Sequence, residues 1–296
     1  MSKTYLYHHN DFDGKSSAAV VQYLSKDLIE NVREVNYGYD YELGKIEEGS
    51  EVIIVDFSFE PEQIIDLIDN KKCHITWIDH HKSAIEKFNS LDAKYWEHID
   101  GIQRSGTDSG CKLCWEFYAV DEPIPEAIEL ISDFDCWVYK HGARTNEFIA
   151  GLYTVNVEPD SDLWNQFFDP ETSEEYVGYI VDAGKNVVKF REKFCEESFN
   201  GKAFKIKFEG LDCYAIGLTG LGSFAFAGSL GDVQAGICFG YNGKRWQYGM
   251  YSEDPNVDVS KICSKYGGGG HKGAGGFSSD VFLLGTENAN EDQQQS

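Results

Sequence analysis

The chain has 296 residues, 42% of them hydrophobic and 14% aromatic, which is enough for two ordinary domains that each bury a core. No apolar run approaches the roughly 18 to 20 residues that cross a bilayer, and the first residues show no signal-peptide pattern; we therefore expect a soluble cytoplasmic protein with no membrane partner. The net charge of −24 argues against binding of long duplex nucleic acid, because affinity for a polyanion comes from Lys and Arg that displace counterions.

Strand and helix signals alternate in the first part of the chain. Short runs rich in β-branched and aromatic residues predict strands at residues 4–9, 51–59 and 74–81. Apolar residues at helical spacing predict helices at residues 14–32 and 61–72, after the first and second of these strands. This order predicts an α/β fold with a doubly wound, mainly parallel sheet, in which ligands collect at the carboxyl ends of the strands.

The middle of the chain reads as helical, and a different pattern follows it. Residues 105–120 and 125–137 predict two helices, and residues 171–198 predict a long helix that joins the two parts of the chain. Shorter strands are then predicted at residues 203–208, 213–218, 234–241 and 245–251. Asn242-Gly243, between the last two, is a strong hairpin signal.

These patterns suggest a division into four parts. We expect a first domain at residues 1–170, a connecting helix and linker at 171–201, a smaller α/β substrate-binding domain at 202–285 and a disordered tail at 286–296. Residues 202–279 hold 8 basic and 6 acidic residues, a local balance of +2, so a short anionic substrate is compatible with this part.

Four clusters of Asp and His fall at the predicted carboxyl edge of the sheet. They are His9, Asp11 and Asp13; Asp56; Asp79, His80 and His81; and Asp133 with Asp135. Imidazole and carboxylate together suit Mn, Fe, Co or Zn. The number of ligands predicts two ions about 3.5 to 4 Å apart with a bridging carboxylate, a common device for attack on phosphorus. Each residue alone can be a turn former or cap, but clustered carboxylates without a cation would repel one another.

The glycine run at residues 267–270 has two interpretations. Consecutive glycines let backbone N–H groups turn toward an anion, which would make the run part of a clamp for a nucleotide end. The alternative is a flexible linker. The candidate substrate-binding residues here are Gly268, Gly269, Gly270 and His271.

Two shorter motifs also leave alternatives open. Arg104 and Ser105 precede a predicted helix, where they would either contact a phosphate at the helix N-terminus or cap the helix. Cys111 and Cys114 form a C-x-x-C pair without the second pair that would complete a zinc site. We interpret the eight cysteines as reduced structural thiols.

The order of these motifs resembles the DHH phosphoesterase family with its DHH-associated C-terminal domain, and within it the nanoRNases, or oligoribonucleases, and RecJ-related proteins. The segments HHNDFDG, VDFS, DHH and SDFD stand in the family's order, and GGGGHKGAGGF matches its C-terminal signature. The resemblance covers about residues 4–278. Together the motifs are highly specific, although D-H-H alone is a weak signal.

The resemblance implies two Mn²⁺ ions, with Mg²⁺ or Co²⁺ as substitutes. The implied ligands are His9, Asp11, Asp13, Asp56, His80 and Asp133, with Asp135 as the other candidate for the last position. His9 and Asp11 would hold one ion, Asp13 and His80 the other, and Asp56 would bridge them. The resemblance further implies that His81 faces the substrate phosphate and that Asp79 orients the histidines.

The implied activity is hydrolysis of short RNA or DNA oligonucleotides, or nanoRNA, to mononucleotides by an exonuclease or oligoribonuclease type of enzyme. The alternatives are a phosphodiesterase for cyclic or linear dinucleotides, a 3′-phosphoadenosine-type nucleotide phosphatase, and a catalytically silent nucleotide-binding regulator. Many relatives carry an Arg-Ser pair where this chain reads Met250-Tyr251-Ser252, and a tyrosine there can stack on a base. Substrate length, RNA against DNA, cleavage polarity and oligomeric state, a homodimer included, stay open.

Overall fold

The computed structural model describes residues 3–25, 29, 31–226 and 228–285. The chain divides into two compact units, which meet in the sequence between Val188 and Lys189. Each unit has its own sheet and its own hydrophobic clusters. The tail that we expect to be disordered, residues 286–296, lies outside the described residues.

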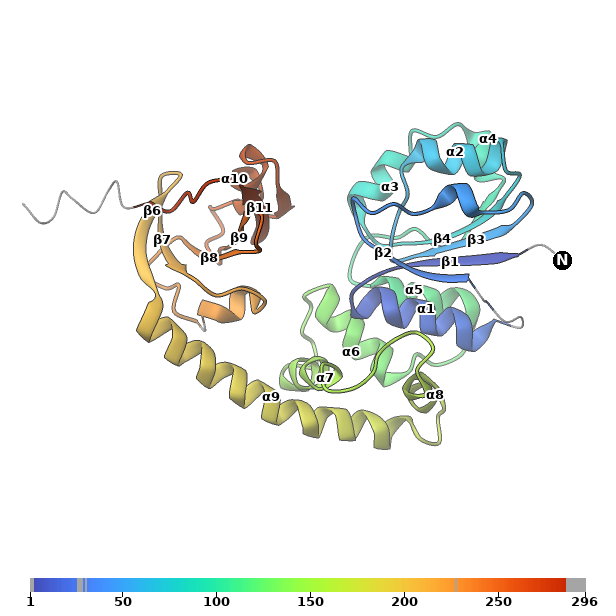
Figure 1. The fold of residues 1–296 in the computed structure, drawn as a ribbon. Helices are drawn as coiled ribbons and strands as arrows, with labels where there is room; N and C mark the ends of the chain where they lie inside the picture. The colour runs from blue at the N-terminus through green and yellow to red at the C-terminus, as the bar shows by residue number, and fades with distance from the viewer. Residues whose placement is uncertain (1–2, 26–28, 30, 227, 286–296) are drawn as a thin grey trace, which may run out of the picture. The chain divides into compact units, whose positions relative to one another are not determined.

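A five-stranded parallel sheet forms the centre of the first unit (Figure 1). Its strands, in spatial order, are β2 (Asn31–Val35), β1 (Thr4–His9), β3 (Glu51–Val55), β4 (His74–Ile78) and β5 (Ile99–Asp100). All neighbouring pairs run parallel. The central strands are short and apolar because helices cover both of their faces. The predicted α/β fold with a doubly wound parallel sheet is confirmed.

Helices cover the two faces of this sheet (Figure 1). On one face lie α2 (Pro61–Asp69), α3 (Lys82–Phe88) and α4 (Ala93–Trp96). The short 3₁₀ helix η1 (Leu43–Lys45) packs in the same hydrophobic cluster. On the other lie α1 (Phe12–Leu24), α5 (Gly110–Tyr118), α6 (Glu126–Asp135), α7 (Ala143–Leu152) and α8 (Asp162–Phe168). Alternate strand residues enter the two cores, as Ile53 and Ile54 illustrate.

One predicted helix is too long. The helix expected over residues 14–32 ends at Leu24, and Asn31 and Val32 belong to β2 instead. Residues 26–28 and 30 lie outside the described residues. The strand was missed because β2 is an edge strand whose residues are mostly half-buried, so its sequence, NVREV, lacks a long apolar run.

The second unit contains a six-stranded mixed sheet. Its strands, in spatial order, are β10 (Gly269–His271), β11 (Ala274–Ser279), β9 (Trp246–Tyr251), β8 (Ala235–Tyr241), β7 (Leu211–Ile216) and β6 (Phe204–Phe208). Only the β7 and β8 pair is parallel. The helix α10 (Val259–Lys265) contributes Val259 and Cys263 to the core of this sheet, and the 3₁₀ helix η2 (Gly222–Phe226) packs in a neighbouring cluster.

Two turn predictions in this unit can be compared with the structure. The hairpin at Asn242-Gly243 is confirmed: the Asn242 N–H donates to the Arg245 carbonyl at 3.2 Å, and Gly243 has a φ of +90°. The flexible-linker interpretation of the glycine run is wrong, because Gly269–His271 is strand β10, paired with β11.

The long helix expected over residues 171–198 is α9 (Ser173–Lys202), and it continues from the first unit into the second (Figure 1). No helix within the described ranges combines the length and apolarity that a membrane span requires. All eight cysteines are free, and Cys111 and Cys114 are buried on α5 in the first core.

Candidate metal centre

The carboxyl ends of β1, β3 and β4 meet at one edge of the parallel sheet. His9 ends β1, Asp56 follows β3, and His80 stands two positions after β4. Asp11 precedes α1 as its N-cap and accepts a hydrogen bond from the Gly14 N–H at 2.9 Å. The topology therefore gathers polar residues that lie far apart in the sequence.

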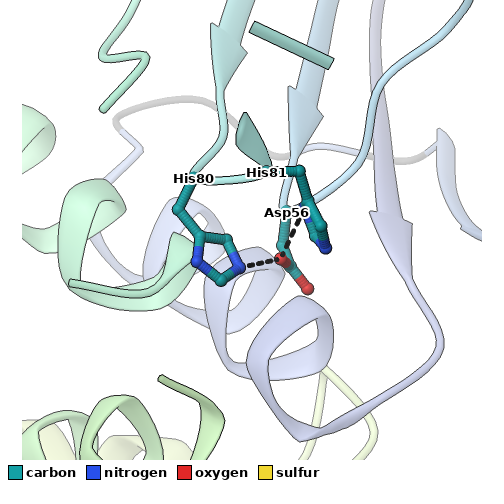
Figure 2. A group of neighbouring side chains, drawn as sticks. All are labelled: Asp56, His80 and His81. Carbon is teal, nitrogen blue, oxygen red and sulfur yellow. Dashed lines mark ion pairs between the residues drawn. The ribbon is translucent and has the colours of Figure 1, made fainter. Parts of the chain in front are cut away.

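The side chains of His80 and His81 both approach Asp56 (Figure 2). His80 Nε2 lies 3.3 Å and His81 Nδ1 3.8 Å from Asp56 Oδ1. At the other carboxylate oxygen, His9 Nδ1 lies 3.9 Å from Asp56 Oδ2, and it is 2.5 Å from Asp11 Oδ2. Two groups of potential metal ligands consequently share Asp56, one with His80 and His81 and one with His9 and Asp11.

Asp56 is the most constrained residue of this cluster. It is 1% exposed, and neither carboxylate oxygen has a hydrogen-bond partner among the described residues. Burial, reinforced by the charges of Asp13 and Asp11, holds the pKa of Asp56 well above its usual range. Its φ of +50° is uncommon for a residue with a side chain. A buried carboxylate without a partner is costly, and a cation is the partner that fits these surroundings.

Asp13 lies beside this cluster and is held by the N-terminus of α5. Its carboxylate accepts hydrogen bonds from Ser109 Oγ at 2.7 Å, the Gly110 N–H at 2.7 Å and the Cys111 N–H at 2.9 Å. Asp13 Oδ2 is also 3.7 Å from His80 Nε2. A Cβ on Gly110 would lie 2.7 Å from the Asp56 Cβ, so only glycine allows α5 to begin this close to the cluster.

The two acidic residues at the end of α6 point to different places. Asp135 Oδ2 lies 3.4 Å from His80 Nε2, and Asp135 joins His80 and Cys136 in a third group of potential ligands. Asp133, our first choice from the sequence, is not brought into any of these groups. Its carboxylate accepts hydrogen bonds from the Lys140 N–H, the His141 N–H and the Thr145 hydroxyl. The geometry therefore favours Asp135 for the last ligand position.

Asp79 and His81 form an oriented pair at the centre. Asp79 is fully buried, and its Oδ1 accepts from His81 Nδ1 at 2.7 Å and from the His80 and His81 N–H groups at 2.7 and 3.1 Å, while Ser58 donates to Oδ2. Burial lowers the pKa of His81, but the hydrogen bond and charge of Asp79 outweigh this and raise the pKa to about 9. The same pairing holds the pKa of Asp79 below its usual range despite its burial.

Arg104 and Ser105 do not stand at the helix N-terminus. The N-cap of α5 is Ser109, so the capping interpretation of Ser105 is wrong. The Arg104 guanidinium instead pairs with Asp108 at 3.0 Å and with Glu116 at 2.8 Å. A phosphate at Arg104 would have to compete with these two carboxylates.

The glycine-rich residues belong to the second unit. A Cβ on Gly268 would lie 2.0 Å from the Gly276 carbonyl oxygen, so this position requires glycine for close backbone approach. A cavity of about 430 Å³ beside the β10–β11 hairpin is lined in part by Gly268, Arg245 and Tyr248. Gly269 and Gly270 lie in β10 with His271, whose side chain is outside what the structure describes. A substrate role for these residues stays a prediction.

Two residues at the centre were missed from the sequence. Cys136 Sγ lies 3.9 Å from His80 Nδ1, and nothing in a lone cysteine after two acidic residues signals this contact. Ser109 orients Asp13, and here a signal existed, since the small residues of the segment TDSG immediately before an apolar helical run are typical of an N-cap.

Comparison with known proteins gives a family match and two related folds. Residues 3–133 match the model of the DHH family, N-terminal domain. The chain is 26% identical over 298 residues to Uncharacterized protein R106 of Acanthamoeba polyphaga mimivirus, an alignment that covers 92% of this chain and 66% of that protein. The chain thus spans just under two thirds of the length of this relative.

Two solved structures are similar over most of the chain. The DHH domain of a member of the s1p family of ribosomal proteins has a TM-score of 0.58 and 15% identity, covering 93% of this chain and 82% of that one. The pGpG-specific phosphodiesterase PggH from Vibrio cholerae has a TM-score of 0.52 and 14% identity, covering 95% and 94%. At such identities the likeness concerns the fold alone.

Proposed function

Residues 3–133 match the DHH family, N-terminal domain, and from this premise we propose that the chain is a metal-dependent phosphodiesterase that hydrolyses nanoRNA to mononucleotides. The observation that carries the proposal is the buried Asp56 carboxylate, which histidines approach at both oxygens and which has no hydrogen-bond partner among the described residues. Paired divalent cations at such a carboxylate suit attack on a phosphoester.

The donor set fits Mn²⁺, with Mg²⁺ or Co²⁺ as substitutes, because imidazole and carboxylate together suit first-row divalent ions. We assign His9 and Asp11 to one ion and Asp56 to both. His80, Asp135 and Asp13 would hold the second ion, since both carboxylates lie within 3.7 Å of His80 Nε2. When bound, the ions would activate a water molecule and offset the charge that builds on the phosphoryl oxygens.

His81 is the proposed general acid. Its Nδ1 is engaged by Asp79, which leaves Nε2 as the ring nitrogen available to a substrate. In the protein without cations Asp79 raises the pKa of His81 to about 9, and a protonated His81 can donate a proton from Nε2 to the leaving oxygen. Asp79 would act through His81, by fixing the ring's orientation and tautomer.

The test is hydrolysis of a substrate panel by the wild-type protein and the Asp56→Ala variant in Mn²⁺. The panel holds labelled RNA from dinucleotides to longer oligomers, cyclic dinucleotides and 3′,5′-bisphosphorylated adenosine. We expect mononucleotides from the short RNA and a loss of kcat/KM of at least about 100-fold in Asp56→Ala, since a metal ion supplies several kcal/mol. Asp182→Ala, at an exposed acidic residue of α9, is the matched control and keeps full activity. Full turnover by Asp56→Ala would refute the proposal.

A second candidate substrate is a linear dinucleotide signal. The specific observation is the fold likeness to PggH, which is described as a pGpG-specific phosphodiesterase. The same panel separates the two candidates: strong preference for one dinucleotide sequence over longer RNA favours the signal, whereas similar rates on several short sequences favour nanoRNA.

A further inference from the structure

Trp137 is an exposed indole beside the candidate metal centre. It is 64% exposed, whereas the other five tryptophans are buried or half-buried. It stands two positions after Asp135 and one after Cys136, whose Sγ lies 3.9 Å from His80 Nδ1. A large apolar side chain is therefore exposed to solvent immediately after two residues, Asp135 and Cys136, whose side chains approach His80.

The backbone that carries Trp137 adopts an uncommon conformation. Trp137 has a φ of +56° and Tyr139 a φ of +53°, a region that bulky residues rarely enter. The two rings meet edge to face, with centroids 6.1 Å apart and planes at 88°. Strained backbone of this kind persists only where the surrounding structure fixes it, and it concentrates at functional sites.

Asp133 supplies the contacts that fix this loop. Its backbone carbonyl accepts from the Val138 N–H at 3.0 Å and the Tyr139 N–H at 3.3 Å. Its buried carboxylate accepts from three more donors, namely the Lys140 N–H at 2.7 Å, the His141 N–H at 3.2 Å and the Thr145 hydroxyl. The backbone carbonyl and the side chain of one residue of α6 thus both fix this loop, and they hold the backbone of Trp137 in one conformation.

The negative charge around the candidate metal centre limits which part of a ligand can bind against Trp137. Several carboxylates converge there, so the phosphate of a substrate belongs with the bound cations, and the neutral indole suits an uncharged, flat group attached to that phosphate. We propose that Trp137 stacks on a nucleobase of the nucleotide whose phosphate is held at the metal centre. The inference rests on the proposed function, and it narrows the substrate class to base-bearing phosphodiesters, to the exclusion of simple polyphosphates.

The kinetic test compares a 5′-phosphorylated diadenylate with two abasic counterparts, each lacking one of the two bases. For Trp137→Ala we expect KM for the diadenylate to rise about 5- to 150-fold, the range that loss of one base stack corresponds to. One abasic substrate should show the same KM with wild-type protein and with Trp137→Ala. Trp137→Phe should keep most of the affinity, because a phenyl ring also offers a π face. Tyr179→Ala, at a 59% exposed tyrosine of α9, is the control and changes nothing.

A binding measurement separates this inference from the proposed function. A diadenylate with a methylene in place of the scissile oxygen is titrated in Mg²⁺ while tryptophan emission is followed. We expect quenching in the wild-type protein and in Tyr179→Ala, and none in Trp137→Phe. Quenching without any hydrolysis of the natural diadenylate would refute the proposed function and leave the stacking intact. Hydrolysis with equal effects of Trp137→Ala on the full and both abasic substrates would overturn the stacking and leave the proposed function intact.

Discussion

At the residue scale, Asp56 links metal binding to folding stability. Its carboxylate is buried without a hydrogen-bond partner among the described residues, and its pKa is held well above the usual range. A carboxyl group with a raised folded pKa favours the folded state at low pH, and this contribution is lost as the pH rises through the folded pKa. Bound cations reverse the preference, because they stabilise the ionised form.

We expect Asp56→Asn to be more stable than the wild-type protein when both are metal-free near neutral pH, and to gain much less from Mn²⁺. The amide keeps the shape of the side chain and removes repulsion from Asp11 and Asp13. A gain of roughly 1 kcal/mol would raise Tm by about 2–4 °C. Calorimetry in EDTA and in Mn²⁺ measures both effects. Equal stabilisation of the two proteins by Mn²⁺ would contradict the bridging role.

The Asp79–His81 pair predicts a pH dependence of the metal-free protein. A histidine with a raised folded pKa contributes fully below its unfolded pKa of about 6.5, and the contribution is lost as the pH rises through the folded value. For His81 that value is about 9. We expect the stability difference between the wild-type protein and His81→Gln to be largest below about pH 6.5 and to shrink toward pH 9. Urea unfolding at several pH values measures it, and a difference that does not change with pH would count against the pairing.

At the element scale, α6 explains why the sequence could not choose between Asp133 and Asp135. Two residues apart on a helix point about 200° apart around its axis, so only one of them can face the metal centre. Which one depends on how α6 packs against α5 and α7, and the segment SDFD does not contain that information. The same geometry gives the other carboxylate its role in holding the loop that follows.

The two positions predict opposite defects. Asp133→Ala leaves the buried Thr145 hydroxyl and two partly buried backbone N–H groups without their acceptor. We therefore expect a loss of stability of roughly 2 kcal/mol, with Mn²⁺ binding largely kept. Asp135→Ala should leave stability nearly unchanged and weaken Mn²⁺ binding at least about 10-fold. Thermal unfolding measures the stability of each variant, and Mn²⁺ titration calorimetry measures its metal affinity. The reverse pattern would return the ligand role to Asp133.

The elements that sequence predicted well share a physical cause. The strands β1, β3 and β4 are covered on both faces, so their apolar runs are unmistakable, and the polar residues at their ends follow from the parallel order. The edge strand β2 and the helices α7 and α8 have weaker patterns, and they were not predicted. Contacts such as Cys136 with His80 depend on tertiary packing, which no local pattern encodes.

At the scale of the whole molecule, the net charge bears on the nucleotide substrates that we propose. The chain carries −24, although residues 202–279 have 8 basic and 6 acidic residues and are nearly balanced. Long-range repulsion should therefore grow with each phosphate of a substrate, and salt should screen it. Electrostatic repulsion of this kind favours short substrates even where no steric barrier excludes long ones.

The salt dependence is the corresponding prediction. Raising KCl from about 20 to about 200 mM at fixed Mn²⁺ should leave KM for a dinucleotide nearly unchanged and should lower or maintain KM for a longer RNA. A basic binding track would give the opposite result, a steep rise of KM with salt. Steady-state kinetics on the two substrates distinguishes these outcomes, and a steep rise would show that a concentrated basic surface outweighs the overall charge.

The carboxylate of Asp13 at the start of α5 has a consequence for the order in which ligands would bind under the proposed function. An unoccupied helix N-terminus commonly binds a phosphate. Here the Asp13 carboxylate occupies that position, because it accepts hydrogen bonds from Ser109, Gly110 and Cys111. If the protein has the proposed function, the carboxylates at this edge of the sheet repel the phosphate of a nucleotide as long as no cation is bound. Binding is then ordered, with the cations first and the phosphoester second. The concentration of manganese in the cell would therefore set the fraction of protein molecules that can bind substrate more than it sets kcat.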